Sequence, residues 1–289
     1  MPQVPQWAMP SEQKAREIPP VSALALRFFQ RIVRAYFRRH FRAVMVQNAE
    51  RLADAQGPLI VYANHSSWWD PMVSILLAQV LSPTRKHYAP MDAAALKRYP
   101  ILGRIGIFPV EMASARGAAQ FLRTSQAILA SGGVVWITPQ GRFSDPREAP
   151  LLFKPGLGTL ATRTPEVTLL PLAIEYTFWN ERLPETLLYF GQPMRIAPGL
   201  STEAATNLLE SALAEAMQKL KTAAIARDAS AFRVLLTGGR GTGGWYGLGR
   251  RVRALITGKP LPIDHTERRE QPALSNESRD PTPRESGGR

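Results

Sequence analysis

The chain has 289 residues, 45% of them hydrophobic, and carries a formal net charge of +13 with a pI near 10.6. A chain of this size buries a substantial core, and we expect one large domain with ragged ends. It contains no cysteine, which excludes disulfides, thiolate metal sites and a cysteine nucleophile. The positive charge calls for an anionic partner: nucleic acid, anionic lipid headgroups or a phosphorylated substrate.

The N-terminal region predicts a flexible segment followed by a basic helix. Residues 1–20 contain prolines and acidic residues where a secretory signal would carry an apolar core, so we expect a cytoplasmic protein. No stretch of 18 or more residues is apolar enough to predict a membrane-spanning helix. Residues 21–50 predict a basic amphipathic helix, because apolar side chains recur at mainly helical spacing. Its arginines are Arg27, Arg31, Arg34, Arg38, Arg39 and Arg42.

Six arginines without an acidic neighbour describe a helix that lies in a membrane interface, with its arginines among headgroup phosphates. We therefore expect a peripheral protein on the inner, cytoplasmic face of the membrane. The alternative is a helix docked on its own domain, its arginines simply solvated.

Residues 51–228 predict an α/β domain, because short apolar runs alternate with helical stretches. We expect a single domain with a mixed β-sheet flanked by helices. The expected strands are "PLIVYAN", "KHYAP", "IGIFPVE", "GGVVWITP", "TLLPLAIEY" and "TLLYFGQP". The expected helices are "DPMVSILLAQVL", "AAALKRYPILGR", "ARGAAQFLRTSQAILAS" and residues 201–226, with Ser201 as N-cap of the last.

The composition shifts after residue 228. Residues 229–258 form a Gly-rich basic segment whose G-x-G-x-x-G match is rejected as a dinucleotide site, because no helix with an acidic partner follows it. Residues 259–289 are polar and proline-rich, and predict a disordered tail.

The stretch "YANHSSWWDPM" places His65 and Asp70 five positions apart, directly after an expected buried strand. A carboxylate in the first turn of the following helix can reach back to the histidine, and the free ring nitrogen then serves as a base. The simpler alternative takes Ser67 as N-cap and Asp70 as its capping-box partner, with no role for His65.

The motif "NHSSWWD" resembles the N-H-x-x-x-x-D motif of the glycerolipid acyltransferases, the family that includes the 1-acylglycerol-3-phosphate acyltransferases. "GIFPVE", "WITPQGRFSD" and "TLLPLAIEY" resemble the family's later blocks in order and spacing, over residues 57–195. The resemblance implies the glycerol-3-phosphate acyltransferase-like fold. It implies His65 as general base, Asp70 as its orienting partner, and direct acyl transfer from acyl-CoA or acyl carrier protein without an acyl-enzyme. No cofactor is expected beyond this co-substrate.

Three positions depart from the family pattern. Glu111 stands where an arginine usually helps to hold the acceptor's phosphate, and Gln140 replaces a glutamate before Gly141. Arg142 comes one place early, while Phe143 occupies the usual arginine slot. A displaced phosphate clamp would draw on the nearby arginines, Arg104, Arg116, Arg142 or Arg147. The expected substrate-binding residues are Asn64, Trp68, Trp69, Glu111, Gln140, Gly141 and Arg142, although tryptophans at a helix start more often belong to the core.

The sequence thus predicts an enzyme of phospholipid biosynthesis that acylates a hydroxyl of a lysophospholipid such as 1-acylglycerol 3-phosphate. Glu111 and Gln140 motivate an alternative acceptor: a glycolipid, an aminolipid or another non-phosphate hydroxyl compound. A non-enzymatic basic protein that binds membrane or nucleic acid is the alternative of another class. Nucleic acid fits poorly, because the arginines are densest on one helix. Without cysteine or an H-E-x-x-H pair, we predict no bound metal.

Overall fold

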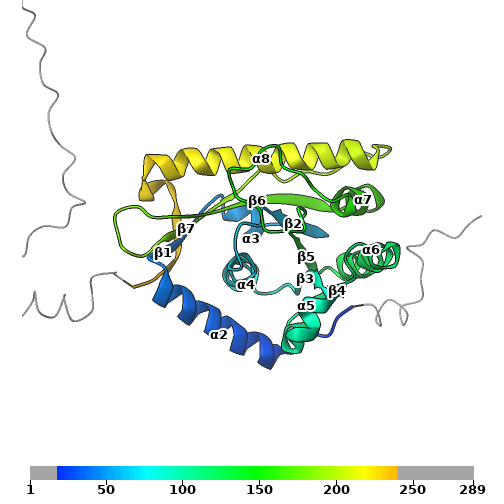
Figure 1. Cartoon of the computed structure of the whole chain (residues 1–289), viewed down its shortest axis with the longest axis horizontal. Coiled ribbons are helices and arrows are strands. Elements are labelled where there is room, and N and C mark those ends of the chain that lie inside the picture. Colours follow the sequence, from blue (N-terminus) through cyan, green and yellow to red (C-terminus); the bar gives the residue numbers. More distant parts are fainter. Residues whose placement is uncertain (1–17, 240–289) are drawn as a thin grey trace, which may run out of the picture. The chain divides into compact units, whose positions relative to one another are not determined.

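The computed structural model describes residues 18–239, which form one sheet with helices on both faces (Figure 1). The helices are α2 (Ala23–His40), α3 (Glu50–Ala53), α4 (Asp70–Leu81), α5 (Ala93–Arg98), α6 (Ala115–Ala130), α7 (Gly156–Arg163) and α8 (Thr202–Ala226), with the 3-10 turns η2 (Pro100–Arg104) and η3 (Ala229–Ala231). The strands are β1 (Ala43–Gln47), β2 (Leu59–Ala63), β3 (His87–Asp92), β4 (Ile107–Val110), β5 (Val134–Ile137), β6 (Thr168–Thr177), β7 (Glu185–Phe190) and β8 (Arg233–Thr237).

The sheet is mixed, in the order β4-β3-β5-β2-β6-β7-β1-β8. Strands β4, β3, β5, β2 and β6 run parallel, β7 is antiparallel to β6, and β8 is antiparallel to β1. The predicted α/β fold with a mixed sheet flanked by helices is confirmed.

Strand β2 lies inside the sheet, and its five residues are all buried. Leu59, Val61 and Ala63 pack in a cluster with α2 and α4, whereas Ile60 and Tyr62 pack with α6, α7 and α8 on the opposite face. A strand buried on both faces reads as a continuous apolar run, as "LIVYA" does. Its carboxyl end therefore leads into the site from a rigid part of the core.

The predicted helix over residues 21–50 is shorter than expected. Helix α2 ends at His40, and residues 43–47 form β1 between β7 and β8. Four consecutive apolar residues, "AVMV", cannot be assigned to helix or strand by periodicity alone. Burial on both sides of the sheet decides for the strand here.

The expected domain boundary at residue 228 is also wrong, because residues 233–237 form β8 and complete the sheet. Directly after β8, the N–H of Gly238 donates to the carbonyl oxygen of Arg42 at 2.9 Å. A Cβ at this glycine would overlap the carbonyl oxygen of Phe41, so the close approach requires glycine.

The other expected elements are found near their predicted positions, and α4 has the predicted bounds. Ser201 caps α8, its hydroxyl oxygen accepting the N–H of Ala204 at 3.1 Å. The expected helix over 93–104 divides into α5 and η2 at Tyr99. Sequence patterns did not identify α7. Between residues 18 and 239, no helix has the length and apolar character needed to cross a membrane.

Three predicted segments lie largely or wholly outside the described residues. They are the flexible N-terminus up to residue 17, the Gly-rich segment from residue 240, and the tail over 259–289.

Candidate active site

The site begins where β2 ends, at Asn64. The side-chain amide of Asn64 donates to the carbonyl oxygen of Ile174 on β6 at 3.0 Å, and its oxygen accepts the Ile174 N–H at 2.8 Å. Both polar groups are therefore used in fixing β2 to β6, and the side chain is only 2% exposed. Asn64 was expected to bind substrate, but the structure gives it the role of directing the chain into the site.

His65 and Asp70 form a hydrogen-bonded pair, with Nδ1 of the imidazole 2.8 Å from Oδ2 of the carboxylate. Asp70 is the first residue of α4 and is 2% exposed, whereas the His65 side chain is 18% exposed. Ser67 is not the N-cap of α4, since the cap position is Trp69. The Ser67 backbone N–H instead donates to Asp70 Oδ2 at 3.0 Å. Asp70 thus makes both contacts that the motif suggested: it accepts a backbone N–H of the preceding loop and it pairs with His65.

Tyr176 completes the pair from the far side, and sequence analysis did not find it. Its hydroxyl donates to Asp70 Oδ1 at 2.7 Å from the end of β6. Burial, and then the negative charge of Asp70, raise the pKa of Tyr176 far above its usual value, so the tyrosine remains a donor. Both oxygens of Asp70 accept hydrogen bonds, and the one that faces the imidazole fixes the His65 proton on Nδ1. Nε2 is then left as the basic nitrogen.

The loop after β5 wraps around His65. The Oε1 atom of Gln140 accepts the His65 N–H at 3.1 Å, and the Ser144 N–H donates to the His65 carbonyl oxygen at 2.8 Å. Phe143 lies against the imidazole, with ring centroids 4.4 Å apart. Gln140 was expected to touch substrate, but it is buried and fixes the backbone of His65. At the position where the family usually has an arginine, this chain thus places an apolar ring over the imidazole of His65.

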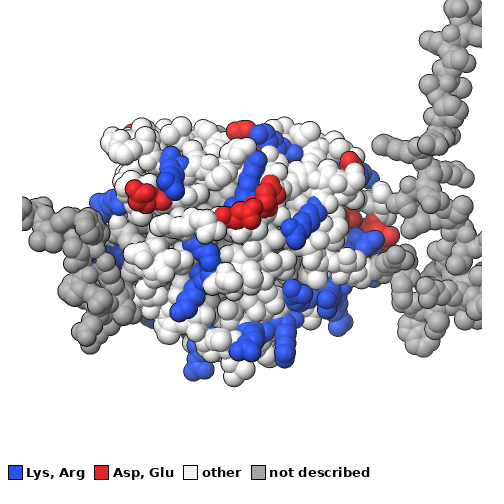
Figure 2. Space-filling view, turned by 180° about the vertical axis from the view of Figure 1, so that it is seen from behind, with Lys and Arg blue, Asp and Glu red and all other residues white. Residues whose placement is uncertain are grey.

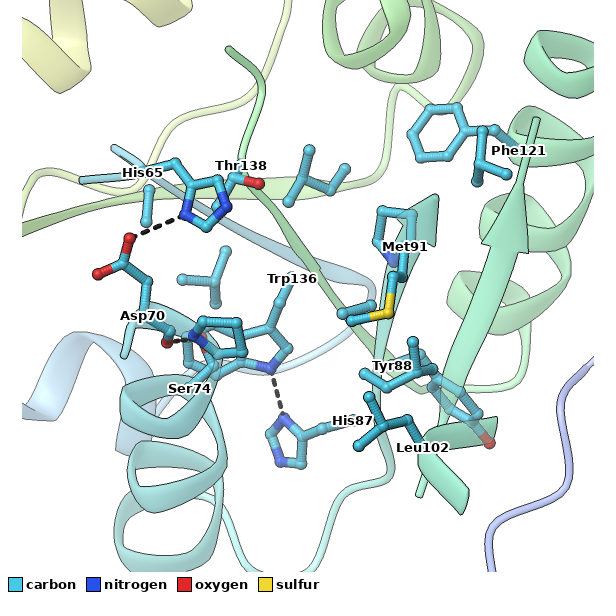
Figure 3. Close-up of a pocket in the computed structure, with 18 of the residues that line it drawn as sticks. His65, Asp70, Ser74, His87, Tyr88, Met91, Leu102, Phe121, Trp136 and Thr138 are labelled. Carbon is cyan, nitrogen blue, oxygen red and sulfur yellow. Dashed lines mark hydrogen bonds and ion pairs between the residues drawn. The ribbon is translucent and has the colours of Figure 1, made fainter. Parts of the chain in front are cut away.

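His65 and Asp70 line a cavity of about 1220 Å³ (Figure 3). The cavity lies between α4 on one side and β3, β4 and α6 on the other, and the N-terminal half of α2 contributes to its wall. Its lining is mainly apolar and includes Leu26, Ile75, Met91, Leu102, Phe121 and Val110. Such a space suits a long hydrocarbon chain whose reactive end lies beside the histidine.

Residues 43–175 match the model of the family described as Acyltransferase. These residues form an acyltransferase domain. The resemblance drawn from the His-x4-Asp motif and the prediction of an enzyme are therefore confirmed, against the alternative of a non-enzymatic basic protein.

The acyltransferase is also similar to a solved structure, the 1-acyl-sn-glycerophosphate (LPA) acyltransferase PlsC from Thermotoga maritima. The TM-score is 0.50 and the sequence identity 19%, with 74% of this chain and 85% of that chain covered. A similarity at this level of identity shows the fold. No curated protein matches the chain.

Three of the expected substrate-binding residues, Glu111, Gly141 and Arg142, line the cavity, and the exposure of Glu111 and Arg142 places them at its mouth. Glu111 follows β4, lines the cavity, and accepts a hydrogen bond from the Ser114 hydroxyl at 3.3 Å. Gly141 and Arg142 line it too, but the Arg142 guanidinium is paired with Glu148, Nη2 to Oε2 at 2.6 Å. The displaced clamp expected from arginines finds little support, because neither Arg104 nor Arg116 is among the lining residues.

The two tryptophans of the motif do not line the cavity. Trp69 packs against Phe41 and Tyr176, with centroids 4.9 and 5.1 Å away, and its indole N–H donates to the Tyr36 hydroxyl at 3.2 Å. Trp68 is 56% exposed and meets Tyr36 edge-on. Trp69 therefore joins α2 to the loop that carries His65, as the core interpretation expected.

A second histidine, His87, lies in the same cavity with a partner at each nitrogen. Its Nε2 is 2.8 Å from the carbonyl oxygen of Ser82, and its Nδ1 accepts the indole N–H of Trp136 at 3.0 Å. Burial lowers the pKa of His87 to about 4, and the charge of Arg85 adds to this shift. His87 is therefore neutral near pH 7 and has no free lone pair.

Proposed function

We propose that this acyltransferase moves a fatty acyl group from acyl-CoA or acyl carrier protein to a hydroxyl of a lysophospholipid, such as 1-acylglycerol 3-phosphate. The observation that carries the proposal is the His65–Asp70 pair opening into the apolar cavity of about 1220 Å³. The acceptor is chosen from the name of the structurally similar Thermotoga protein and from the family resemblance.

The proposed reaction is a single transfer. Nε2 of His65 takes the proton of the acceptor hydroxyl as its oxygen attacks the carbonyl carbon of the thioester. The carbon–sulfur bond breaks as the tetrahedral intermediate collapses, and the imidazolium returns the proton to the departing thiolate. Asp70 stabilises the imidazolium and keeps its orientation throughout. The acyl chain occupies the cavity, so the thioester carbon is held beside the base.

Mass spectrometry of the products tests this function. The purified full chain is given acyl-CoA or acyl carrier protein and a panel of phosphorylated and neutral lipid acceptors, with His65→Ala in parallel. We expect an acylated lysophospholipid that is lost in the variant. Product of equal yield from the variant would contradict the assigned base.

A second acceptor class is favoured by Glu111. A carboxylate at the mouth of the cavity repels a phosphate but accepts hydrogen bonds from hydroxyl or amino groups of a glycolipid or aminolipid. Preferential acylation of the neutral or amino acceptors in the same panel would select this class. Glu111→Arg would then shift the preference towards phosphorylated acceptors.

We propose further that the enzyme works as a peripheral protein on an anionic membrane, with the outer face of α2 as its contact. Leu24, Phe28 and Ile32 are 79%, 60% and 44% exposed along this face. The exposed arginines Arg27, Arg31, Arg38 and Arg39 share it. An apolar stripe beside cations suits lipid acyl chains below and headgroup phosphates above.

The surface around α2 supports this orientation. Figure 2 shows Lys and Arg side chains along the lower edge of the molecule, where α2 and α5 lie in Figure 1, and Asp and Glu only in the upper half of that view. The neighbouring turn η2 is tied to α2 by the Ser22 N–H, which donates to the Arg104 carbonyl oxygen at 2.8 Å. Tyr99 and Ile101 add exposed apolar side chains there.

Vesicle sedimentation tests the membrane proposal on the full chain. Replacing Arg31 and Arg38 together by Gln should weaken binding to anionic vesicles by roughly fivefold per charge. Leu24→Ser with Phe28→Ser should weaken it in anionic and neutral vesicles alike. The matched control replaces Arg163 and Lys221, which are exposed on other helices. An equal loss in the control would show that only total charge matters.

A further inference from the structure

Five basic residues line the cavity that holds His65, and they differ in their distance from His65 and in the partners of their charged groups. They are Arg27, Arg85, Lys86, Arg142 and Lys154. Arg85 and Lys86 come just before β3, at the amino ends of the parallel strands. His65 follows β2, at the carboxyl ends of the same parallel strands, on the opposite side of the sheet's length. Arg85 and Lys86 therefore cannot act on a group that reacts at His65.

The arginines have other tasks. Arg85 donates to the carbonyl oxygens of Gly57 and Gly132, at 2.6 and 3.1 Å, and so joins two loops. Arg142 is neutralised by Glu148, as described above. Arg27 belongs to the outer face of α2, and its Nε donates back to the Ala23 carbonyl oxygen at 3.4 Å. These three guanidinium groups therefore either bind other groups of the protein or lie on its outer surface.

Lys154 is placed differently. Its backbone N–H donates to the Pro139 carbonyl oxygen at 2.8 Å, which anchors it to the loop that wraps His65. Its side chain crosses Gly141, where an added Cβ would lie 2.7 Å from Cε and 2.9 Å from Nζ. Gly141 directly follows Gln140, whose side chain holds the His65 N–H. Within residues 18–239, no hydrogen bond or ion pair is found for the Lys154 ammonium.

We propose that Lys154 binds a phosphate group of a substrate at the mouth of the cavity, replacing the arginine that is absent from positions 111 and 143. An ammonium on a flexible stem supplies a point charge that a phosphate oxygen can accept. It also offsets the repulsion from Glu111, which lines the same cavity. A side chain at position 141 would meet the end of the Lys154 side chain and would also be strained, because φ of Gly141 is +63°. The inference rests on the proposed acyl transfer.

A phosphate can reach this position from two sources: the acceptor lipid or the phosphopantetheine arm of the acyl donor. Both present the same chemistry to Lys154. The experiment therefore pairs two acceptors, 1-acylglycerol 3-phosphate and monoacylglycerol, with two donors, acyl-CoA and S-acyl pantetheine, which lacks the phosphate. The value of kcat/KM is measured for each of the four pairs.

We expect Lys154→Met to lower kcat/KM by about 10- to 100-fold where the phosphate is present, the usual loss for one charged hydrogen bond. Lys154→Arg should restore part of the rate, because it keeps the positive charge. The control is Lys221→Met on α8, an exposed lysine away from the cavity. A loss that vanishes with monoacylglycerol assigns Lys154 to the acceptor. A loss that vanishes with S-acyl pantetheine assigns it to the donor.

The proposal is overturned if Lys154→Met has no effect on any pair, or lowers kcat/KM equally for monoacylglycerol with S-acyl pantetheine. If the wild-type enzyme forms no product with any pair, the proposed function fails, and calorimetry then tests Lys154 by itself. Binding of CoA and of 1-acylglycerol 3-phosphate is compared between wild type and Lys154→Met. Weaker binding of either to the variant supports the phosphate site, whereas equal affinities for both overturn it.

Discussion

Two histidines line one cavity, and the partners of their ring nitrogens separate them. His65 gives Nδ1 to a carboxylate and keeps Nε2 without a partner among residues 18–239. His87 gives one nitrogen to a carbonyl oxygen and the other to the indole N–H of Trp136. The first arrangement creates a base with a fixed tautomer, while the second consumes the lone pair that a base needs. The comparison teaches that a histidine in a reactive cavity is identified by its partners.

The largest expected effect is the difference between replacing His65 and replacing His87. His65→Ala should lower kcat by about 10²- to 10⁴-fold, because the general base is removed. His87→Gln should retain most of the turnover, because Gln keeps a donor and an acceptor. Steady-state kinetics on both variants, with circular dichroism to confirm folding, measures the difference. Comparable losses in kcat would break the distinction drawn between the two histidines.

A smaller loss is expected from Asp70→Asn. The amide keeps the shape of the carboxylate but cannot stabilise the imidazolium and favours the wrong tautomer, so kcat should fall by about 10²-fold. Measuring kcat from pH 6 to pH 9 checks this. An unchanged kcat would show that His65 acts without its carboxylate.

Tyr176→Phe should reduce kcat by roughly 10-fold, because it removes one hydrogen bond to a charged carboxylate that itself only positions the base. KM should stay close to the wild-type value, since Tyr176 does not line the cavity. A change in KM alone would place Tyr176 in substrate binding instead of in positioning.

The last prediction concerns stability and not turnover: lowering the pH should destabilise the folded protein through His87. Its pKa is about 4 in the folded protein against an ordinary value of 6.5, so the unfolded chain binds more protons between these values. The free energy of unfolding should therefore fall as the pH drops from about 7 towards 4, by about 1 to 2 kcal/mol at pH 5. Urea unfolding at pH 7.5 and pH 5 measures this loss, which should be smaller in His87→Gln. An equal loss in both proteins would remove His87 as its source.

Local patterns in the chain predicted much of the fold and the centre of the site. The apolar run "LIVYA" and the helix over 70–81 were placed correctly, because burial on both faces and a helix of three turns leave strong signals. His65 and Asp70 were paired from five positions of spacing. The run "AVMV" was assigned to the wrong element, because a short apolar stretch fits both helix and strand.

Other parts of the site depend on residues far apart in the chain. Tyr176 meets Asp70 across 106 positions, and the Asn64 side chain turns to Ile174 across 110. No spacing rule connects such residues, because the sheet order that joins them results from packing of the whole domain. The pairing of Arg142 with Glu148 and the position of Lys154 over Gly141 depend likewise on the path of one loop.

The sequence by itself predicted the α/β fold from its periodicity and the proximity of His65 and Asp70 from their short spacing, while the resemblance of the motif blocks pointed to an acyltransferase. The tertiary structure decided which nitrogen of each histidine is free, which cations are neutralised, and which side chains face the cavity. These are properties of partners brought together by burial. The sequence contains four histidines, and only the folded core separated His65, the proposed base, from His87, whose ring nitrogens both have partners in the cavity wall.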